Sequence, residues 1–216
     1  MKYIIMCGGT FQQWETPRQL VSINGESLVC RTIRLLMEAG VPVADIFISS
    51  NNPAFEGLGV PVLHHENNYA NGRGSGLWIE AFYPTDEPTC YICGDVLFSP
   101  EAIQTIVNTQ TDDIEFFASA PPFHKLYTKP WAEPFAFKVV DTAHLKKAVK
   151  QTREYHRQHA FRRHPIAWEL WQVIKGTELN KIDYTNYTVI NDYTCDIDQP
   201  EDVPVLVKKL RRVLKG

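Results

Sequence analysis

Short apolar runs alternate with amphipathic segments through the first half of the chain. The run from Tyr3 to Cys7 is apolar throughout and stops at Gly8-Gly9, which is typical of a buried parallel strand that ends in a tight loop. Similar runs recur further along, and segments with apolar residues at helical spacing lie between them. The pattern predicts strands at 3–7, 45–50, 59–63 and 89–93, and helices at 27–39, at 77–82 and from 99 onward.

Capping signals mark where the predicted helices begin and end. Gly40 follows the first amphipathic segment directly, where a glycine can take the backbone conformation that closes a helix. Ser99 and Pro100 suit the N-cap and the first helical position, because serine accepts a bond from a helix N–H group and proline has no N–H to leave unpaired. These signals predict one helix that ends before Gly40 and another that begins after Ser99.

The second half of the chain has a less regular pattern, but it still mixes strands and helices. We expect strands at 114–120, 135–140 and 187–190, and helices at 142–158, 165–175 and 200–214. Together the two halves predict an α/β fold: a three-layer α/β/α domain around a mainly parallel mixed sheet. Ligands of such sheets bind beyond the carboxyl ends of the strands. A length of 216 residues suits a single domain, 1–216, with a core that needs no disulfide or metal to hold it.

The composition is that of an ordinary soluble protein and narrows the possible partners. A net charge of −3 and a pI of about 6.2 argue against binding to a nucleic acid polymer, which needs a basic surface, and leave a small anionic substrate open. The five cysteines are an odd number and are scattered, which is typical of reduced thiols in the cytosol. No apolar run is long enough for a membrane span or a signal peptide, so we expect a cytoplasmic protein.

The loop after the first strand is the first candidate for chemistry. A glycine pair in Cys7-Gly8-Gly9-Thr10 lets backbone N–H groups approach a phosphate or a base, although a plain turn between strand and helix uses the same residues. The spacing is that of neither a dinucleotide fingerprint nor a P-loop. The next helix does not begin until Ser27, and a loop of this length favours contact with a ligand or a role as a lid.

Carboxylates at the ends of strands are the second candidate. Asp95 follows a buried strand, where it suits a magnesium ion that bridges substrate phosphates, or alternatively caps a turn. Asp196 and Asp198 fall on one face of an extended segment, because side chains alternate along a strand. Glu201 and Asp202 lie in the first turn of the last predicted helix, where negative charge is favourable for structural reasons alone.

In their order and spacing these elements resemble small nucleotidyltransferases of the glycosyltransferase-A-like superfamily, such as sugar-phosphate nucleotidyltransferases, phosphocholine cytidylyltransferase and molybdenum cofactor guanylyltransferase. The pieces that carry the resemblance are Gly8-Gly9, Pro17-Arg18-Gln19-Leu20, Ile23 to Leu28, Gly94-Asp95 and Asp196 to Asp202. The resemblance implies a nucleotide-diphospho-sugar transferase-like fold. It also implies transfer of a nucleoside monophosphate from a nucleoside triphosphate to a small phosphorylated acceptor, a sugar phosphate or a phosphocholine-like molecule, with release of pyrophosphate and with Mg²⁺ as cofactor.

The resemblance also assigns roles to single residues. Arg18 takes the place of the family's catalytic lysine, Asp95 binds the metal, and Asp196 or Asp198 is the second metal ligand. The residues that it places at the nucleotide are Cys7, Gly8, Gly9, Thr10, Arg18, Asn68, Gly74 and Ser75. One feature departs from the family: no arginine follows Thr10, so one of two expected cations is absent there. The loop that holds Asn68 is equally well explained as a polar surface loop.

An acceptor-binding insertion is expected at about 120–180. Its aromatic segment suits a sugar or choline pocket, because aromatic faces stack on sugars and attract quaternary ammonium; its residues are Tyr127, Lys129, Trp131 and Glu133. The basic stretch from Arg153 to His164 is either a solvated helix face or a surface for an anionic acceptor or partner. Trp168 and Trp171 are interpreted as helix core.

Two motifs with possible metal or redox chemistry receive structural interpretations. His64 and His65 are adjacent on a strand and point to opposite sides, so a shared ion is not expected. Cys90 and Cys93 form a C-x-x-C pattern within a predicted buried strand rather than at the start of a helix, which does not favour redox activity.

Two alternative functions stay open at this point. A glycosyltransferase that consumes a nucleotide sugar uses the same fold class, but its usual Asp-x-Asp metal motif is absent at Asp95-Val96-Leu97. A degenerate, non-catalytic nucleotide-binding protein is favoured by the missing arginine. The oligomeric state is open, and an oligomer is possible.

Overall fold

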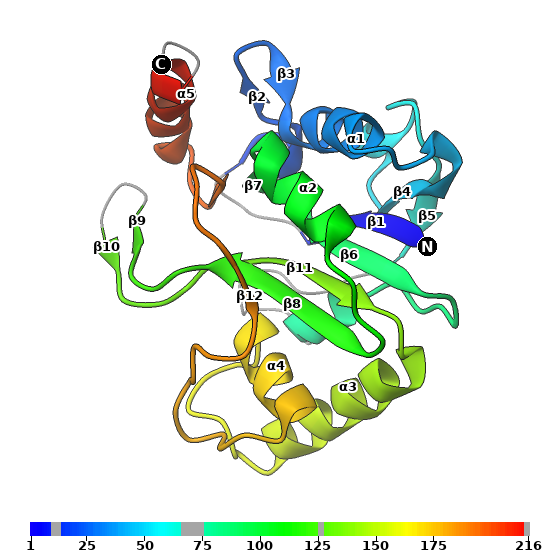
Figure 1. Cartoon of the computed structure of the whole chain (residues 1–216), viewed down its shortest axis with the longest axis vertical. Helices are drawn as coiled ribbons and strands as arrows, with labels where there is room; N and C mark the ends of the chain where they lie inside the picture. Colours follow the sequence, from blue (N-terminus) through cyan, green and yellow to red (C-terminus); the bar gives the residue numbers. More distant parts are fainter. Residues whose placement is uncertain (10–13, 66–75, 125–127, 214–216) are drawn as a thin grey trace.

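The computed structural model of the chain describes residues 1–9, 14–65, 76–124 and 128–213. Its centre is a seven-stranded sheet in the order β12-β8-β11-β6-β1-β4-β5 (Figure 1). β11 runs antiparallel to both of its neighbours, and the other neighbouring strands pair in parallel. The strands are β1 (Lys2–Met6), β4 (Ile46–Ser50), β5 (Val62–His64), β6 (Thr89–Cys93), β8 (Ile114–Ser119), β11 (Pro134–Val139) and β12 (Thr188–Ile190).

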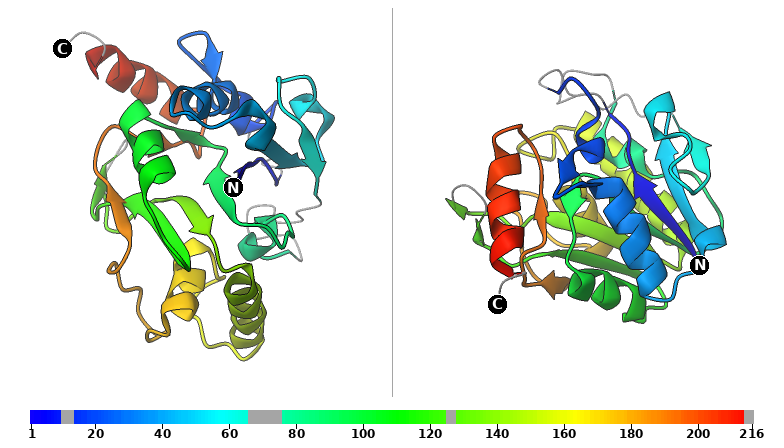
Figure 2. Two further views of the ribbon diagram at one scale, coloured as in Figure 1. Left: turned by 45° about the vertical axis from the view of Figure 1, so that its right-hand side comes forward. Right: turned by 90° about the horizontal axis from the view of Figure 1, so that it is seen from above.

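Helices cover both faces of this sheet, which confirms the three-layer prediction. α1 (Leu28–Glu38) and α2 (Pro100–Asn108) lie on one face, and α3 (Thr142–Arg157) and α4 (Ala167–Lys175) lie on the other (Figures 1 and 2). The short 3₁₀ helix η4 (Trp78–Ala81) packs into the same hydrophobic cluster as α3 and α4. α5 (Asp202–Val213) follows the last strands of the chain. In the part of the chain that the structure describes, no helix is long and apolar enough to cross a membrane.

The central strand explains why the first apolar run has no polar alternation. Ile4 and Met6 pack into the cluster under α3 and α4, whereas Tyr3, Ile5 and Cys7 pack into the cluster under α1 and α2. Successive side chains point to opposite faces of a strand. Because helices cover both faces, every position of β1 beyond Lys2 is buried, and the strand is apolar throughout.

The predicted caps are present at both helices. The Ser27 hydroxyl accepts a bond from the Cys30 N–H group at 3.3 Å, and the Ser99 hydroxyl accepts one from Ala102 at 2.9 Å. Gly40 has a φ of 90°, so it closes α1 in the left-handed region that favours glycine. These local signals are therefore read correctly from the sequence.

Two predicted elements are shorter or differ in type. β5 begins at Val62, because Pro61 precedes it and has no N–H group for a ladder bond. The predicted helix at 77–82 is the 3₁₀ helix η4, which spans four residues. Both differences concern edges of elements and leave the arrangement of the layers unchanged.

Small elements surround the carboxyl ends of the central strands. A 3₁₀ helix and two hairpin strands fill the segment between β1 and α1: η1 (Arg18–Leu20), β2 (Ser22–Ile23) and β3 (Glu26–Ser27). Two further 3₁₀ helices flank β4: η2 (Val43–Asp45) precedes it, at its amino end, and η3 (Pro53–Phe55) follows it. Two short antiparallel pairs follow, β7 (Val96–Leu97) with β13 (Cys195–Asp196), and β9 (Phe123–His124) with β10 (Thr128–Lys129).

The ends of β1 and β6 approach each other closely at Gly94. The Gly94 N–H group donates to the Met6 carbonyl at 3.1 Å. A Cβ atom at position 94 would lie 2.7 Å from both the Cys7 sulfur and the Met6 carbonyl oxygen, which a real side chain does not tolerate. Gly9 has a φ of 86°, so the loop after β1 also uses a conformation that favours glycine. Glycine at these two positions sets the shape of the edge where the predicted site residues lie.

Candidate active site

Four segments that are far apart in the sequence meet beyond the carboxyl ends of β1 and β6. Arg18 comes from η1, Asp95 follows β6, Lys129 ends β10, and Asp198 follows β13. The Arg18 guanidinium pairs with Asp95 through Nη2 and lies 3.4 Å from Asp198 Oδ1 through Nη1. The Lys129 ammonium lies 3.1 Å from Asp198 Oδ2. The two oxygens of Asp198 therefore each face a different cation.

Strand pairing brings the two acidic segments together. In the β7–β13 pair, Asp196 stands opposite Val96, one residue after Asp95. The Ile197 N–H group donates to the Asp95 carbonyl at 2.8 Å, which continues the contact past the end of the strands. Asp196 and Asp198 then lie 3.9 Å and 3.1 Å from the Lys129 ammonium, so the prediction that they share one face is confirmed.

Lys129 is the most enclosed cation of the group. Its side chain is 5% exposed, and its ammonium also lies 3.8 Å from Glu133 Oε2. The rings of Phe123 and Trp131 have their centroids 5.8 Å and 5.5 Å from the same nitrogen. A buried ammonium needs carboxylates, carbonyl oxygens or aromatic faces to replace its hydration. Lys129 has both kinds of neighbour.

The backbone at Asp198 is held from two sides. Asp202 is 2% exposed, and its Oδ2 atom accepts the N–H groups of Asp198 at 2.8 Å and Gln199 at 3.1 Å. The Trp14 indole N–H donates to the Asp198 carbonyl oxygen at 3.1 Å. Carboxylate acceptors form the stronger kind of hydrogen bond. Asp202 therefore holds the preceding loop, a structural role different from the favourable charge in the first helical turn that the sequence predicts.

Carboxylates outnumber cations among the described residues at this edge. Four carboxylates lie around Arg18 and Lys129: Asp95, Glu133, Asp196 and Asp198. Among the described residues, no three His, Cys, Asp or Glu side chains are arranged as a ready set of metal ligands. Magnesium commonly takes one or two carboxylates and completes its shell with waters and substrate phosphates, and the oxygen donors here fit that chemistry. The metal role of Asp95, Asp196 and Asp198 stays a prediction.

Two thiols lie beside the site in surroundings that disfavour their thiolate forms. Burial raises the pKa of Cys7 well above its ordinary value, and the Asp95 carboxylate raises it further. Burial and the same carboxylate raise the pKa of Cys93 in the same way. A thiol reacts as its thiolate. Both groups therefore stay protonated at neutral pH and serve as packing between β1, β6 and Gly94.

The structure brings the predicted site residues together in part. Arg18, Asp95, Asp196 and Asp198 form one group, and Cys7, Gly8 and Gly9 end the neighbouring strand β1. Four predicted nucleotide-binding residues lie outside the described residues: Thr10, Asn68, Gly74 and Ser75. Tyr127 also lies outside them.

Two other predicted features lie away from this group. The basic stretch begins on α3, below the sheet as drawn in Figure 1, and three of its arginines pair with Glu80, Glu154 and Glu169. Trp168 and Trp171 are each 1% exposed, which confirms them as core.

Sequence reasoning missed Lys129 as the second cation and Asp202 as the residue that fixes the Asp198 loop. Lys129 had been interpreted only as part of an aromatic segment. The available signal was a lysine four residues before Glu133 in a stretch rich in proline and aromatic residues. That signal does not show which carboxylates the lysine meets, because Asp198 is 69 residues away in the chain.

Comparisons with known proteins agree with this architecture. The family model described as "MobA-like NTP transferase domain" matches residues 3–166. A candidate glucose-1-phosphate thymidylyltransferase from Bacillus anthracis superposes with a TM-score of 0.59 at 13% identity, covering 96% of this chain and 94% of that one. The inositol-1-phosphate CTP transferase from T. maritima gives 0.55 at 16%, covering 98% and 96%.

A third solved structure has the same fold. The 4-diphosphocytidyl-2C-methyl-D-erythritol synthase from Anaerococcus prevotii superposes with a TM-score of 0.55 at 11% identity, covering 98% of this chain and 99% of that one. At such identities the likeness shows the fold, which is the nucleotide-diphospho-sugar transferase-like fold expected from the sequence. No curated protein matches the chain in sequence.

Proposed function

Because the chain belongs to the family of MobA-like NTP transferase domains, we propose that it transfers a nucleoside monophosphate to a small phosphorylated acceptor. The donor is a nucleoside triphosphate, and pyrophosphate is the second product. Names of similar solved structures, a glucose-1-phosphate thymidylyltransferase and an inositol-1-phosphate CTP transferase, support an acceptor that carries a phosphate. The acceptor is a sugar phosphate or a phosphocholine-like molecule.

The observation that carries this proposal is the placement of Arg18 and Lys129 on the two oxygens of Asp198. In the proposed reaction an acceptor phosphate oxygen attacks the α-phosphorus of the nucleotide and pyrophosphate leaves. The acceptor is already an anion, so no side-chain nucleophile is required. The protein has to hold two polyanions in line and to neutralise them. Two converging cations at the carboxyl edge of the sheet suit this task.

Each charged residue has a stated role in the proposal. Arg18 and Lys129 exchange their carboxylate partners for phosphate oxygens when the substrates bind, and Arg18 can donate to two oxygens at once. Asp95 and Asp198 then hold the magnesium ion, with Asp196 as the alternative to Asp198. A bound magnesium ion supplies electrostatic stabilisation of charge on the phosphates. The resemblance to the family predicts a second cation after Thr10, and this sequence has no arginine there. Lys129 provides that second cation instead, which argues against a degenerate, non-catalytic protein.

The nucleotide and the acceptor are assigned to different segments of the chain. The loop Cys7 to Thr10 and the residues Asn68, Gly74 and Ser75 bind the nucleotide. The segment 120–180 supplies the acceptor pocket, as an insertion in the single domain 1–216. Trp131 supports this assignment because its ring is 37% exposed and lies beside the Lys129 ammonium. An exposed aromatic face next to a phosphate-binding cation suits the body of a sugar or of choline.

The direct test is pyrophosphate release. Each nucleoside triphosphate is combined with each of a set of sugar phosphates and with phosphocholine, with magnesium and after its removal by EDTA. The proposal expects release from one combination of triphosphate and acceptor, and loss of release with EDTA. Transfer from a nucleotide sugar without any such release would identify a glycosyltransferase instead. Asp95→Ala should abolish the magnesium-dependent release, and full activity of that variant would overturn the metal assignment.

Isothermal titration calorimetry separates catalysis from binding alone. We expect one triphosphate to bind in the presence of magnesium, and Arg18→Ala to weaken that binding. Absence of binding for every triphosphate contradicts the proposal. Binding without pyrophosphate release, across the whole acceptor set, would support a nucleotide-binding protein that has no transferase activity.

A further inference from the structure

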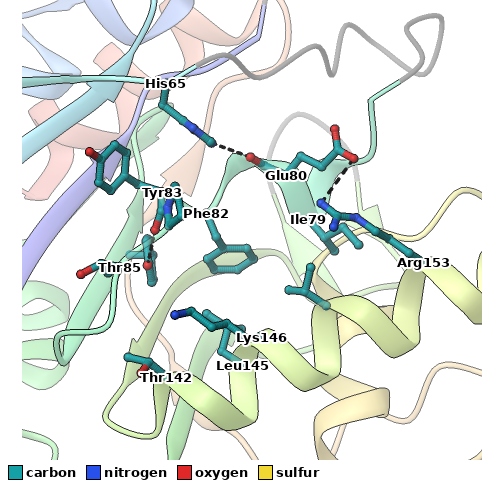
Figure 3. Close-up of a pocket in the computed structure, with 13 residues that line it drawn as sticks. His65, Ile79, Glu80, Phe82, Tyr83, Thr85, Thr142, Leu145, Lys146 and Arg153 are labelled. Carbon is teal, nitrogen blue, oxygen red and sulfur yellow. Dashed lines mark hydrogen bonds and ion pairs between the residues drawn. The ribbon is translucent and has the colours of Figure 1, made fainter.

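A cavity of about 480 Å³ lies between α3, η4 and the segment that leads into β6 (Figure 3). It is on the face of the sheet that α3 and α4 cover. The described residues that line it include none of the charged residues of the candidate active site. Sites for small molecules commonly have volumes of about 300 to 1,000 Å³. The cavity is therefore a separate space of the size that a small ligand needs.

Apolar side chains form the inner walls of this cavity. Ile79 from η4 and Leu145 and Val149 from α3 line it, together with the rings of Phe82 and Tyr91. The two rings meet edge to face at 4.9 Å between centroids. Walls of this kind suit a ligand with a flat, apolar body, because such a body can pack against aliphatic and aromatic surface at once.

The polar atoms of the inner wall are already satisfied. The Tyr91 hydroxyl donates a hydrogen bond to the Tyr83 carbonyl at 2.6 Å. The hydroxyl therefore has its partner, and the aromatic ring of Tyr91 faces the cavity. The His65 Nε2 atom lies 2.6 Å from the Glu80 carbonyl and ties η4 to the end of β5. These bonds hold the walls in place without a ligand. A ligand therefore does not have to order them on binding.

Two cations stand at the rim, seven residues apart on the same face of α3. Arg153 Nη2 lies 3.5 Å from Glu80 Oε1, and Lys146 pairs with Asp86. The side chains of Lys146 and Asp86 are 51% and 92% exposed, and that of Arg153 is 46% exposed. Ion pairs so open to water contribute little to stability. Either cation can therefore turn to an anionic group on a ligand at small cost.

We propose that this cavity binds a small amphipathic anion, a molecule with a flat apolar ring system and one carboxylate, sulfonate or phosphate group. The ring system packs between Phe82 and Val149, and the anionic group meets Arg153 at the rim. The inference does not depend on the transferase proposal, because the site shares no charged residue with it. Its test accordingly measures binding and needs no enzymatic activity.

A pair of fluorescent probes tests the two halves of the proposal. Anilinonaphthalene sulfonate has a flat aromatic body and one negative charge, and phenylnaphthylamine has the same body without the charge. We expect the sulfonate to bind the full chain at one site, by fluorescence and by calorimetry. A charged hydrogen bond corresponds to about tenfold or more in affinity, so the sulfonate should bind about tenfold more tightly than the neutral probe.

Substitutions on α3 test whether the two probes bind in the cavity. Val149→Trp fills the space and should abolish binding of both probes. Arg153→Gln should weaken the sulfonate about tenfold and leave the neutral probe unchanged. Lys150→Gln removes an exposed cation from the same helix without touching the cavity, and it should bind both probes like the wild type. Thermal unfolding followed by circular dichroism identifies a variant that has not folded.

Each result of these binding measurements either supports or overturns the proposal. Unchanged sulfonate binding in Val149→Trp would overturn the proposal, and so would binding without a defined stoichiometry. Equal weakening in Arg153→Gln and Lys150→Gln would show an effect of net charge on the helix and would also overturn it. If Val149→Trp does not fold, the contrast between the two glutamine variants decides the question.

Discussion

Two groups of paired charges lie in different places on this fold, and water reaches them to different extents. At the candidate active site the side chains of Lys129 and Arg18 are 5% and 13% exposed; at the rim of the cavity those of Lys146 and Arg153 are 51% and 46% exposed. Charges attract more strongly where water is excluded, and a buried charge that loses its partner is costly. The comparison teaches that each buried cation of the active site always needs an anionic partner, a carboxylate or a substrate phosphate, whereas the exposed pairs at the rim can open to water at little cost.

Removal of the buried lysine, Lys129, is the change with the largest expected effect, and it tests whether burial matters for the role of a cation. Lys129→Ala should lower kcat for pyrophosphate release roughly a hundredfold to a thousandfold, the usual loss when one preorganised charge-stabilising group is removed. Lys147→Ala removes an exposed lysine from α3 and should stay within about twofold of the wild type. Steady-state kinetics with the best substrate pair measures both. Similar losses in the two variants would mean that burial of Lys129 has no bearing on its role.

A milder change tests the geometry of Arg18 rather than its charge. Its two Nη atoms face two different carboxylates, Asp95 and Asp198, and a lysine has a single charged nitrogen. Arg18→Lys should therefore lower kcat/KM about tenfold to a hundredfold, the loss expected for one charged hydrogen bond. Arg162→Lys on the exposed basic stretch serves as the matched control. Wild-type kcat/KM in Arg18→Lys would show that charge alone is required.

The elements of the fold were predictable because their signals are local. The apolar runs Tyr3 to Cys7 and Cys90 to Cys93, each followed by a glycine, mark β1 and β6. The caps at Ser27 and Ser99 lie within three residues of the groups that they satisfy. The order of the strands was not predicted, because strand order depends on pairings between distant segments. The antiparallel insertion of β11 between β6 and β8 is an example.

The residues of the candidate site show the same difference between local signals and contacts that depend on the tertiary structure. Arg18, Asp95 and Asp198 were found because each stands near a strand end or in a segment that resembles the family. Lys129 was missed because its strand, β10, has two residues and no periodicity, and its partners are set by tertiary structure. The cavity under α3 had no signal at all, since its lining comes from several elements whose side chains meet only after folding.

The free energy of unfolding should distinguish a buried carboxylate from an exposed one. Asp202 is 2% exposed and accepts two N–H groups, so Asp202→Ala should lower the free energy of unfolding by about 1.5 to 3 kcal/mol. Asp202→Asn keeps one acceptor oxygen and should lose less. Glu201→Ala changes the exposed neighbour and should stay within about 0.5 kcal/mol. Urea unfolding measures all three, and equal effects of the two alanine variants would contradict the assignment.

The smallest expected effect lies at the exposed end of α3, in the response of stability to pH. The ring of His156 lies 4.6 Å from that of His164. Burial lowers the pKa of His156 below its ordinary value of 6.5, and the charges of His164 and His159 lower it further. Well above pH 6.5 the ring is neutral in both the folded and the unfolded state and has no effect on the pH dependence of stability. As the pH falls below this value the unfolded chain takes up the proton first, so the folded state loses stability until the pH reaches the folded pKa.

His156→Gln should therefore lose less stability than the wild type as the pH falls through 6.5. The measurement is the free energy of unfolding in urea at each pH, compared as a difference between the two proteins so that other titrating groups cancel. His64→Gln is measured in parallel as the matched control for the loss of one histidine, because the side chain of His64 is 76% exposed and lies on β5, away from α3. If His156→Gln loses as much stability on acidification as the wild type does, the neighbouring histidines do not destabilise the protonated His156 ring. Water would then screen the charges at this end of α3.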